Sequence, residues 1–212
     1  MVQRICCGSV NCYIVSYGKN AVLVDTGRER YRQKIWSACK PYDVRLLMLT
    51  HGHVDHVQNA AYLSNVFGCP VGMNRADIPL LKDNMLQSLS AHDLLGRVVL
   101  AASEKSFYKD KIPAFVPEVS LNDGYSLDIF GIPAKVISLP GHTQGSIGLD
   151  VMEKDLIVGD ALMNMFYPTV SMLYNDKTAM LESVDKISQL GDRKLYFGHG
   201  KPVKNRNWTV IK

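Results

Sequence analysis

The sequence lacks several features that define large classes of protein. No apolar run in its 212 residues approaches the roughly 18 residues of a membrane-spanning helix, so no membrane is expected as a partner. No basic block is longer than two residues and the net charge is only +4, which argues against nucleic acid as a partner. The apolar stretch near the start of the sequence is too short and too interrupted to be that of a signal peptide. We therefore expect a cytoplasmic protein that acts on a small-molecule substrate.

Cysteine is also scarce. The chain has five cysteines, an odd number, and no C-x-x-C pair, so a disulfide framework is not expected. Most of these cysteines have apolar neighbours, which is typical of buried and reduced thiols. A hydrophobic content of 47% with 21% charged residues is typical of a folded chain, and the length favours a single domain over residues 1–212.

Short apolar runs separated by turn residues predict an α/β fold. We expect strands at 12–16, 21–24, 44–49, 69–73, 119–121, 125–130, 134–139, 147–151, 156–158 and 195–197, and helices at 30–38, 54–67 and about 177–190. Residues 76–112 differ from both flanks, because their leucines and valines recur at helical intervals. This segment predicts one or two amphipathic helices, inserted between two strand-rich halves.

The segment Thr50–His56 contains three of the six histidines of the chain, together with an aspartate. Neutral imidazole and carboxylate are the ligands that zinc and similar cations prefer. His51 and His53 are two residues apart and can converge on one ion from an extended turn. Asp55 and His56, adjacent at a helix start, would point elsewhere and serve a neighbouring ion. The segment therefore predicts a metal site.

Three further residues of ligand type follow apolar runs, and each has a glycine immediately before it. They are His142, Asp160 and His199. Glycine at a strand end lets the backbone pass close to an ion, and sites in sheet-based folds gather at such edges. The seven candidate ligands are His51, His53, Asp55, His56, His142, Asp160 and His199. Seven ligands are too many for one tetrahedral ion and suit two ions bridged by a carboxylate.

The order of these motifs resembles the metallo-β-lactamase superfamily, in which H-x-H-x-D-H is followed by a lone histidine, an aspartate and a final histidine. The resemblance extends from Leu23–Gly27 to Gly198–Gly200. It implies a four-layered αββα sandwich that holds two divalent metal ions at one edge, with zinc favoured and iron or manganese as alternatives.

The resemblance also implies a role for each residue. His51, His53 and His142 would bind the first ion, Asp55, His56 and His199 the second, and Asp160 would bridge them. Asp25 matches an aspartate beneath the site that steadies a ligand, and a turn residue that caps Gly27 is the equal alternative.

Within the superfamily, Asp160 sets this chain apart from true β-lactamases, which usually carry cysteine or serine at that position. The combination of Asp160 with His56 is similar to the glyoxalase II, lactonase and phosphodiesterase branches. Thirteen residues follow His199, which are too few for the helical region with which glyoxalase II enzymes bind glutathione. The label of β-lactamase therefore describes the family and not the expected activity.

We expect a hydrolase in which a hydroxide that bridges the two ions attacks a small ester-like substrate. Asp55 would orient this hydroxide and take its proton, which makes Asp55 the predicted catalytic residue. A thioester is the favoured substrate, followed by a lactone and a phosphodiester. The main alternative is an iron-dependent persulfide dioxygenase of the same fold, and a non-enzymatic metal-binding protein is the third hypothesis.

The surroundings of the site are less determined by the sequence. Asn164, Tyr167 and Tyr174 are candidates for oxyanion stabilisation, Lys201 is a candidate for contact with an anionic substrate, and His92 is expected to be exposed. The insertion at about 76–112 is expected to form a wall or lid over the substrate, with one apolar face buried. The alternative is that this face is the contact of a homodimer.

Overall fold

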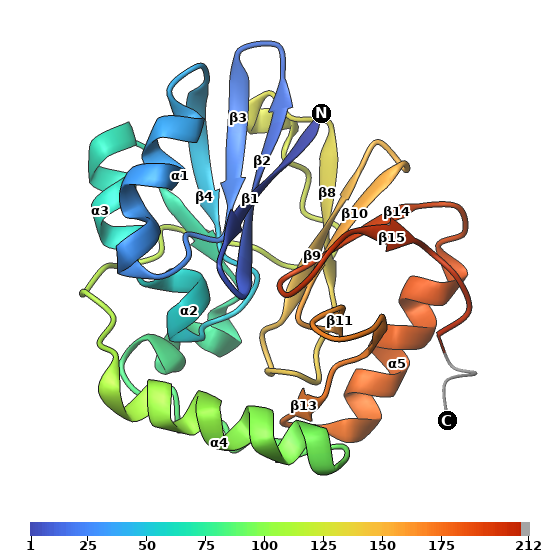
Figure 1. Cartoon of the computed structure of the whole chain (residues 1–212). Coiled ribbons are helices and arrows are strands. Elements are labelled where there is room, and N and C mark those ends of the chain that lie inside the picture. Colours follow the sequence, from blue (N-terminus) through green and yellow to red (C-terminus); the bar gives the residue numbers. More distant parts are fainter. Residues whose placement is uncertain (209–212) are drawn as a thin grey trace.

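The computed structural model describes residues 1–208, which form four layers (Figure 1). Two β-sheets lie face to face, and helices cover the outer face of each sheet. This arrangement confirms the four-layered αββα sandwich expected from the sequence.

The first sheet has six strands in the order β1-β2-β3-β4-β5-β7. Its strands are β1 (Val2–Cys7), β2 (Val10–Tyr17), β3 (Asn20–Val24), β4 (Asp43–Met48), β5 (Val71–Met73) and β7 (Val119–Ser120). The helices that follow its strands are η1 (Glu29–Tyr31), α1 (Arg32–Cys39), α2 (Val54–Val57) and α3 (Ala60–Phe67). β1, β2 and β3 form an antiparallel meander, and the pairs from β3 to β7 are parallel.

The second sheet has five strands in the order β15-β14-β10-β9-β8. Its strands are β8 (Ala134–Ser138), β9 (Ile147–Val151), β10 (Asp155–Gly159), β14 (Lys194–Phe197) and β15 (Val203–Lys204), and α5 (Lys177–Gln189) covers it. Two short pairs lie near the end of this sheet: β11 (Leu162–Met163) with β12 (Thr169–Val170), and β13 (Leu173–Tyr174) with β6 (Ser90–Ala91).

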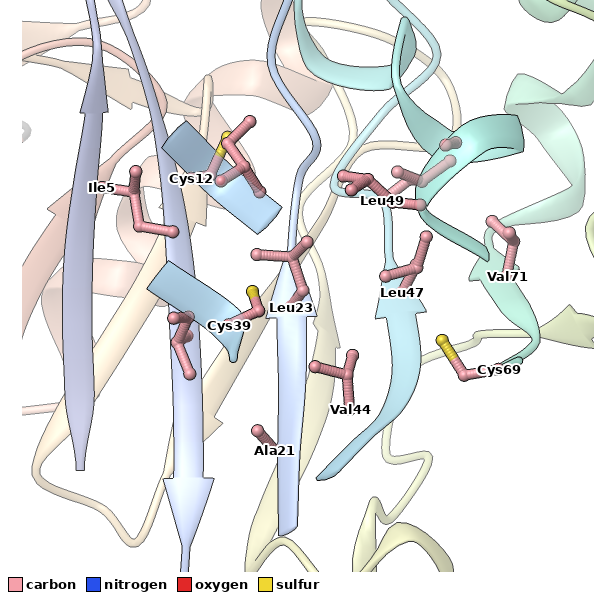
Figure 2. Packing of buried hydrophobic residues seen from close by; sticks show 14 of the residues in the cluster. Ile5, Cys12, Ala21, Leu23, Cys39, Val44, Leu47, Leu49, Cys69 and Val71 are labelled. Carbon is pink, nitrogen blue, oxygen red and sulfur yellow. The ribbon is translucent and has the colours of Figure 1, made fainter. Parts of the chain in front are cut away.

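Three apolar clusters fill the three interfaces between the four layers. The alternation of side chains along a strand divides β2 between two of them. Cys12 and Ile14 pack towards α1 and α3, as Figure 2 shows for Cys12, whereas Tyr13 and Val15 pack between the two sheets. Leu139 and Phe197 lie in the third cluster, against α5. The sheets are therefore buried on both faces, which explains why several strands have continuous apolar sequences.

Five strands end at the same edge of the sandwich. β3 and β4 are parallel to each other, as are β10 and β14. β8 runs in the direction of β10, because both are antiparallel to β9, which lies between them. The residues that follow these five strands are brought together at this edge.

One predicted strand is wrong. In place of a strand at 125–130, the chain forms the 3-10 helix η3 (Asp128–Phe130), with only an isolated bridge at Ser126. The Ser126 hydroxyl donates to the Asp128 carboxylate and also accepts from the Asp128 backbone N–H, and these local bonds compete with the extended conformation. The predicted helix at 54–67 is divided into α2 and α3, and β1 was not expected from the sequence pattern.

The insertion contains one α-helix, α4 (Leu94–Lys109), preceded by the 3-10 helix η2 (Arg75–Leu81) and β6. Its expected buried face is observed only in part, because Val99 and Phe107 are half-buried whereas Leu94 and Val98 are 76% and 67% exposed. Figure 1 shows α4 lying across the edge of the sandwich at which the five strands end. No helix among residues 1–208 is long and apolar enough to cross a membrane.

Candidate metal centre

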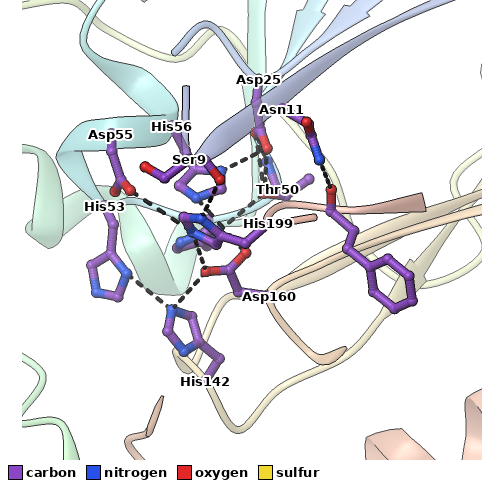
Figure 3. A network of polar contacts seen from close by, with 12 residues as sticks. Ser9, Asn11, Asp25, Thr50, His53, Asp55, His56, His142, Asp160 and His199 are labelled. Carbon is purple, nitrogen blue, oxygen red and sulfur yellow. Dashed lines mark hydrogen bonds and ion pairs between the residues drawn. The ribbon is translucent and has the colours of Figure 1, made fainter. Parts of the chain in front are cut away.

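The edge where the five strands end gathers all seven candidate ligands (Figure 3 labels six of them). Their ligand atoms form three groups, and within each group these atoms lie within 4.8 Å of one another. The groups are His51 with His53 and His142, His51 with His56 and Asp160, and Asp55 with His56 and His199. The first and third match the two sets expected for two ions, and the second places Asp160 between them. The binding of metal by these residues stays a prediction, but their geometry fits it.

Several buried polar atoms of this cluster have no hydrogen-bond partner among residues 1–208. They are Nε2 of His51, His53 and His56, and Oδ1 of Asp160. A buried polar atom without a partner costs about 1–3 kcal/mol, so such atoms are rare in folded proteins unless a ligand or water satisfies them. Two divalent cations at the two expected positions would satisfy all of them, and imidazole nitrogen with carboxylate oxygen is the donor set that zinc and iron accept.

The other ring nitrogen of several histidines is held by the protein. His142 Nδ1 lies 2.9 Å from the Leu173 carbonyl oxygen, and His199 Nδ1 lies 2.8 Å from the carbonyl oxygen of Ser9. A ring that donates Nδ1–H to an oxygen leaves Nε2 as a lone-pair donor, which is the form that binds metal. The ring of His53 stacks on Phe107 of α4, with centroids 4.7 Å apart. The rings are therefore oriented by contacts outside the candidate ligand set.

Asp25 lies directly beneath the cluster, at the end of β3. Its carboxylate accepts hydrogen bonds from the Thr50 backbone N–H at 2.8 Å and from the Thr50 hydroxyl at 2.9 Å, and His56 Nδ1 lies 2.8 Å away. Asp25 has a positive φ of 59°, which is unusual for a residue other than glycine. Asp25 was expected either to steady a ligand or to cap the turn at Gly27. These contacts favour the first alternative.

Burial and charge act in opposite directions on the histidines. Burial holds the pKa of His51 and of His53 well below its usual range, so both rings stay neutral. Burial also opposes a charge on His56, but the carboxylates of Asp160, Asp25 and Asp55 outweigh it and raise the pKa of His56 to about 10. The negative charge of these carboxylates favours a proton on His56, and it would favour a divalent cation at the same place for the same reason.

The carboxylates of the cluster stay ionised. Burial opposes the charge on Asp160, but His199 and His56 outweigh burial and hold its pKa well below the usual range. In Asp55, burial is likewise outweighed by His56, His199 and Arg28, which lower its pKa. Asp160 Oδ2 lies 3.2 Å from His199 Nε2 and 3.7 Å from His142 Nε2. Asp160 therefore faces a candidate ligand of each ion.

Two of the three glycines that precede candidate ligands, Gly159 and Gly198, lie where strand ends approach each other closely. A Cβ on Gly198 would lie 2.0 Å from Asp160 Oδ1 and 2.9 Å from Cε1 of His56, so no side chain fits there. Gly159 has a φ of +54° and lies against Thr50. Both positions let one strand end pass close to another, and larger residues would push the ligands apart.

A cleft of about 50 Å³ opens beside the cluster, beneath α4. Besides candidate ligands, it is lined by Arg28 and Ser103 and by the apolar side chains of Leu89, Val99, Phe107, Met163, Met165 and Leu173. Residues 76–112 thus contribute part of the cleft wall.

None of Asn164, Tyr167, Tyr174 and Lys201 lines the cleft, so the described structure does not support them as contacts to the reacting group. Asn164 instead stabilises the loop that follows His199, because its side-chain N–H donates to the Lys201 carbonyl oxygen at 2.8 Å. His92 is exposed, as expected.

One important residue was missed from the sequence. Asp77 of η2 is completely buried, and its carboxylate accepts hydrogen bonds from the backbone N–H of Gly52 at 3.0 Å and of Gly145 at 2.7 Å. It also accepts from the Thr143 hydroxyl at 2.6 Å and from the Gln87 side chain at 3.2 Å. Asp77 therefore joins the loop of the first two histidines to the loop that follows His142. No local sequence signal distinguishes it from an exposed aspartate.

Comparisons with known proteins agree with this geometry. The family model of the metallo-β-lactamase superfamily matches residues 7–199. The chain therefore belongs to the metallo-β-lactamase superfamily, whose members are generally metal-dependent hydrolases. Hydroxyacylglutathione hydrolase GloC of Haemophilus influenzae is 30% identical over 198 residues, which cover 90% of this chain and 85% of that protein.

Solved structures show the same fold. The B3 metallo-β-lactamase BLEG-1 superposes with a TM-score of 0.76 at 24% identity, over 96% of this chain and 94% of its own. TTHA1623, solved in a di-iron-bound form, superposes with a TM-score of 0.66 at 25% identity, over 92% of this chain and 89% of its own.

Proposed function

We propose that the protein is a hydrolase that uses two divalent metal ions to cleave a small ester-like substrate, with a thioester favoured over a lactone or a phosphodiester. The observation that carries this proposal is the convergence of three overlapping ligand groups beside an open cleft. A structural metal site is closed by its protein ligands, whereas a catalytic site keeps a position open for water or substrate. The cleft beside this cluster provides that position.

In this proposal, His51, His53 and His142 hold one ion, Asp55, His56 and His199 hold the other, and Asp160 lies between them. Bound ions would lower the pKa of a water molecule to about 7 and polarise the substrate oxygen. Zinc is the favoured metal, and the di-iron-bound form of one structural neighbour supports testing iron beside it.

Asp55 is the residue best placed to handle the proton of the attacking water. Its side chain lines the cleft and is 16% exposed, whereas that of Asp160 is 5% exposed. The neighbouring histidines and Arg28 keep the pKa of Asp55 low in spite of burial, so its carboxylate is available as a base. A carboxylate within hydrogen-bond reach of the water can orient it and accept its proton as the bond to the substrate forms.

Two observations support a thioester. The cleft is small, and its walls apart from the candidate ligands are mostly apolar, which suits a small acyl group. The related protein of H. influenzae is named a hydroxyacylglutathione hydrolase, and hydroxyacylglutathione is a thioester.

Metal analysis of the purified protein beside a substrate panel tests the proposal. We expect about two transition-metal ions per chain and hydrolysis of a thioester at higher kcat/KM than of a lactone, a phosphodiester or a β-lactam. Asp55→Asn should lower kcat by at least about 100-fold, the usual size of a general-base contribution. The matched control is Asp192→Asn, at an exposed aspartate outside the cleft, which should retain full activity.

Oxygen consumption distinguishes the second hypothesis, an iron-dependent dioxygenase that acts on persulfides. Consumption of oxygen with a persulfide by the iron-loaded protein, without thioester hydrolysis by the zinc-loaded protein, would refute the proposal of a hydrolase. Failure to hold any metal would refute both.

A further inference from the structure

A second hollow lies beside the metal cleft, between the turn after β3 and helix α4. This groove has a volume of about 580 Å³. Arg28 lines both the groove and the cleft, so the two spaces lie on either side of its side chain. Ser103 and Phe107 of α4 face the cleft, while Lys105 and Lys109 of the same helix line the groove. Two neighbouring stripes on the surface of α4 therefore form walls, one of the cleft and the other of the groove.

The groove carries more positive than negative charge. Its four basic side chains are Arg28, Arg30, Lys105 and Lys109. Its two acidic side chains already have arginine partners, because Asp110 pairs with Arg28 and Glu29 lies 3.5 Å from Arg32. Among residues 1–208, the other three basic side chains of the groove have no acidic group within 4.0 Å. They are available to an anion from outside the chain.

The size of the cleft shows why a substrate would extend into this groove. A volume of about 50 Å³ holds a small acyl group next to the reacting atoms, but not the thiol carrier to which that group is joined. The carrier must leave the cleft along a wall, and Arg28 is the residue at which the cleft and the larger groove adjoin. In that space the exposed ammonium groups of Lys105 and Lys109 lie one helical turn apart, a spacing that suits a carrier with more than one negative charge.

We propose that this groove binds the anionic carrier of the substrate, so that the protein selects thioesters of thiols that bear carboxylate or phosphate groups. Lys105 and Lys109, with Arg30, attract the carrier, while the pairing of Arg28 with Asp110 and the hydrogen bond from the Ser106 hydroxyl to Asp110 at 2.9 Å hold the end of α4 against the turn. The inference rests on the proposed thioester hydrolysis for its reaction, but the groove can be tested separately from it.

The experiment compares three thioesters with the same acyl group on the metal-loaded protein. Acetyl-coenzyme A carries phosphates, S-acetylglutathione carries carboxylates, and S-acetyl-N-acetylcysteamine is neutral. The double variant Lys105→Gln/Lys109→Gln should lower kcat/KM about tenfold for an anionic thioester, since each exposed charge pair contributes a factor of up to about five and two pairs are lost. Its effect on the neutral thioester should be less than about twofold. The anionic thioester that loses more identifies phosphate or carboxylate as the group bound.

Two controls separate the groove from general charge effects. Lys135→Gln/Lys154→Gln removes the same charge from exposed residues that do not line the groove, and this variant should retain the preference for anionic thioesters. Lys201→Gln tests the lysine next to the His199 loop, which also lies outside the groove and should have no effect. An equal loss for neutral and anionic thioesters in the groove variant, or the same loss in either control, would overturn the proposal.

A binding measurement keeps the groove testable if no thioester is cleaved. S-methyl-coenzyme A and S-methylglutathione cannot react, and their affinities for the metal-loaded protein can be measured by calorimetry. Binding of one of them that weakens about tenfold in the groove variant, without hydrolysis, would support the groove and refute thioesterase activity. Equal affinities in the parent and the variant would overturn the groove, whatever the activity.

Discussion

Asp77 offers the sharpest test of how this site is held together. The carboxylate joins the loop that carries His51 and His53 to the loop that follows His142, through bonds from the backbone N–H groups of Gly52 and Gly145. It is completely buried and touches none of the candidate metal positions directly. Asp77→Ala therefore removes a positioning residue and leaves every candidate ligand in place.

The magnitude follows from the bonds that are lost. The alanine variant leaves two buried backbone N–H groups without acceptors, and each such group costs about 1–3 kcal/mol. It also loses the bonds from the Thr143 hydroxyl and the Gln87 side chain, which can turn to other partners. We expect the free energy of unfolding to fall by about 3–5 kcal/mol, a large share of the 5–15 kcal/mol of a typical domain.

Asp77→Asn refines this test because it retains the shape of the side chain. Its amide nitrogen must replace one carboxylate oxygen, and each oxygen accepts from a backbone N–H, Gly52 at Oδ2 and Gly145 at Oδ1. In either orientation of the asparagine amide, one of these two backbone N–H groups faces the amide NH2, a donor, in place of an acceptor. We expect a loss of about 1–3 kcal/mol, between the parent and the alanine variant.

Urea denaturation of the metal-free protein measures these losses apart from metal binding, and a metal titration then measures affinity. Asp83→Ala is the matched control, because Asp83 is exposed in the same segment and accepts one local bond, from the Met85 N–H. It should change stability by less than about 1 kcal/mol. An Asp77→Ala variant with unchanged stability and unchanged metal affinity would refute the role assigned to this carboxylate.

Three further outcomes are expected. Asp160→Ala should lower metal content at both positions, whereas His199→Ala should chiefly empty the second; two ions bound as tightly in the Asp160 variant would show that this carboxylate does not bridge. Replacing residues 93–110 by a short flexible link removes α4 and keeps Asp77. We expect this variant to bind metal as the parent does and to have a higher KM. A change from dimer to monomer, measured by light scattering, would instead assign the helix to a subunit contact. Alkylation at pH 8 should modify Cys6 first, because it is the exposed cysteine of the five and because burial raises the pKa of Cys39 and Cys69 to about 12; rapid loss of several thiols per folded chain would contradict this.

The candidate ligands could be predicted from the sequence because metal chemistry restricts the residue types. Few side chains suit a divalent cation, and a close approach of backbone at a strand end requires glycine, so His199 after Gly198 stands out in a linear chain. The same restriction does not apply to the residues that support the ligands. Asp77 and Thr143 are 66 positions apart, and their bond exists only because two sheets bring η2 beside the loop after β8. A long-range contact of this kind has no local signature.

Most of the two-residue strands, β7 excepted, were not predictable for a related reason. β11, β12 and β13 have two residues each, and they are strands only because a partner lies beside them. α4 shows the opposite case, in which a clear periodic pattern predicted the helix but not its packing. Its apolar residues Val99 and Phe107 are half-buried and line the cleft, whereas Leu94 and Val98 are exposed. Periodicity identifies a helix, but not whether its apolar stripe meets a core or a cleft.

The metal centre and the surface that would select the substrate are built from different parts of this chain. The candidate ligands and Asp25 follow strand ends that three apolar clusters fix in place, so their positions depend on the whole sandwich. The cleft wall and the groove depend largely on α4, of which only Gly96 is fully buried. We therefore expect substitutions along α4 to change little in the core, and substitutions at the strand ends to disturb both stability and any metal binding. A change of substrate in a chain of this fold is consequently easiest through α4 and the turn at Arg28, with the ligand set left intact.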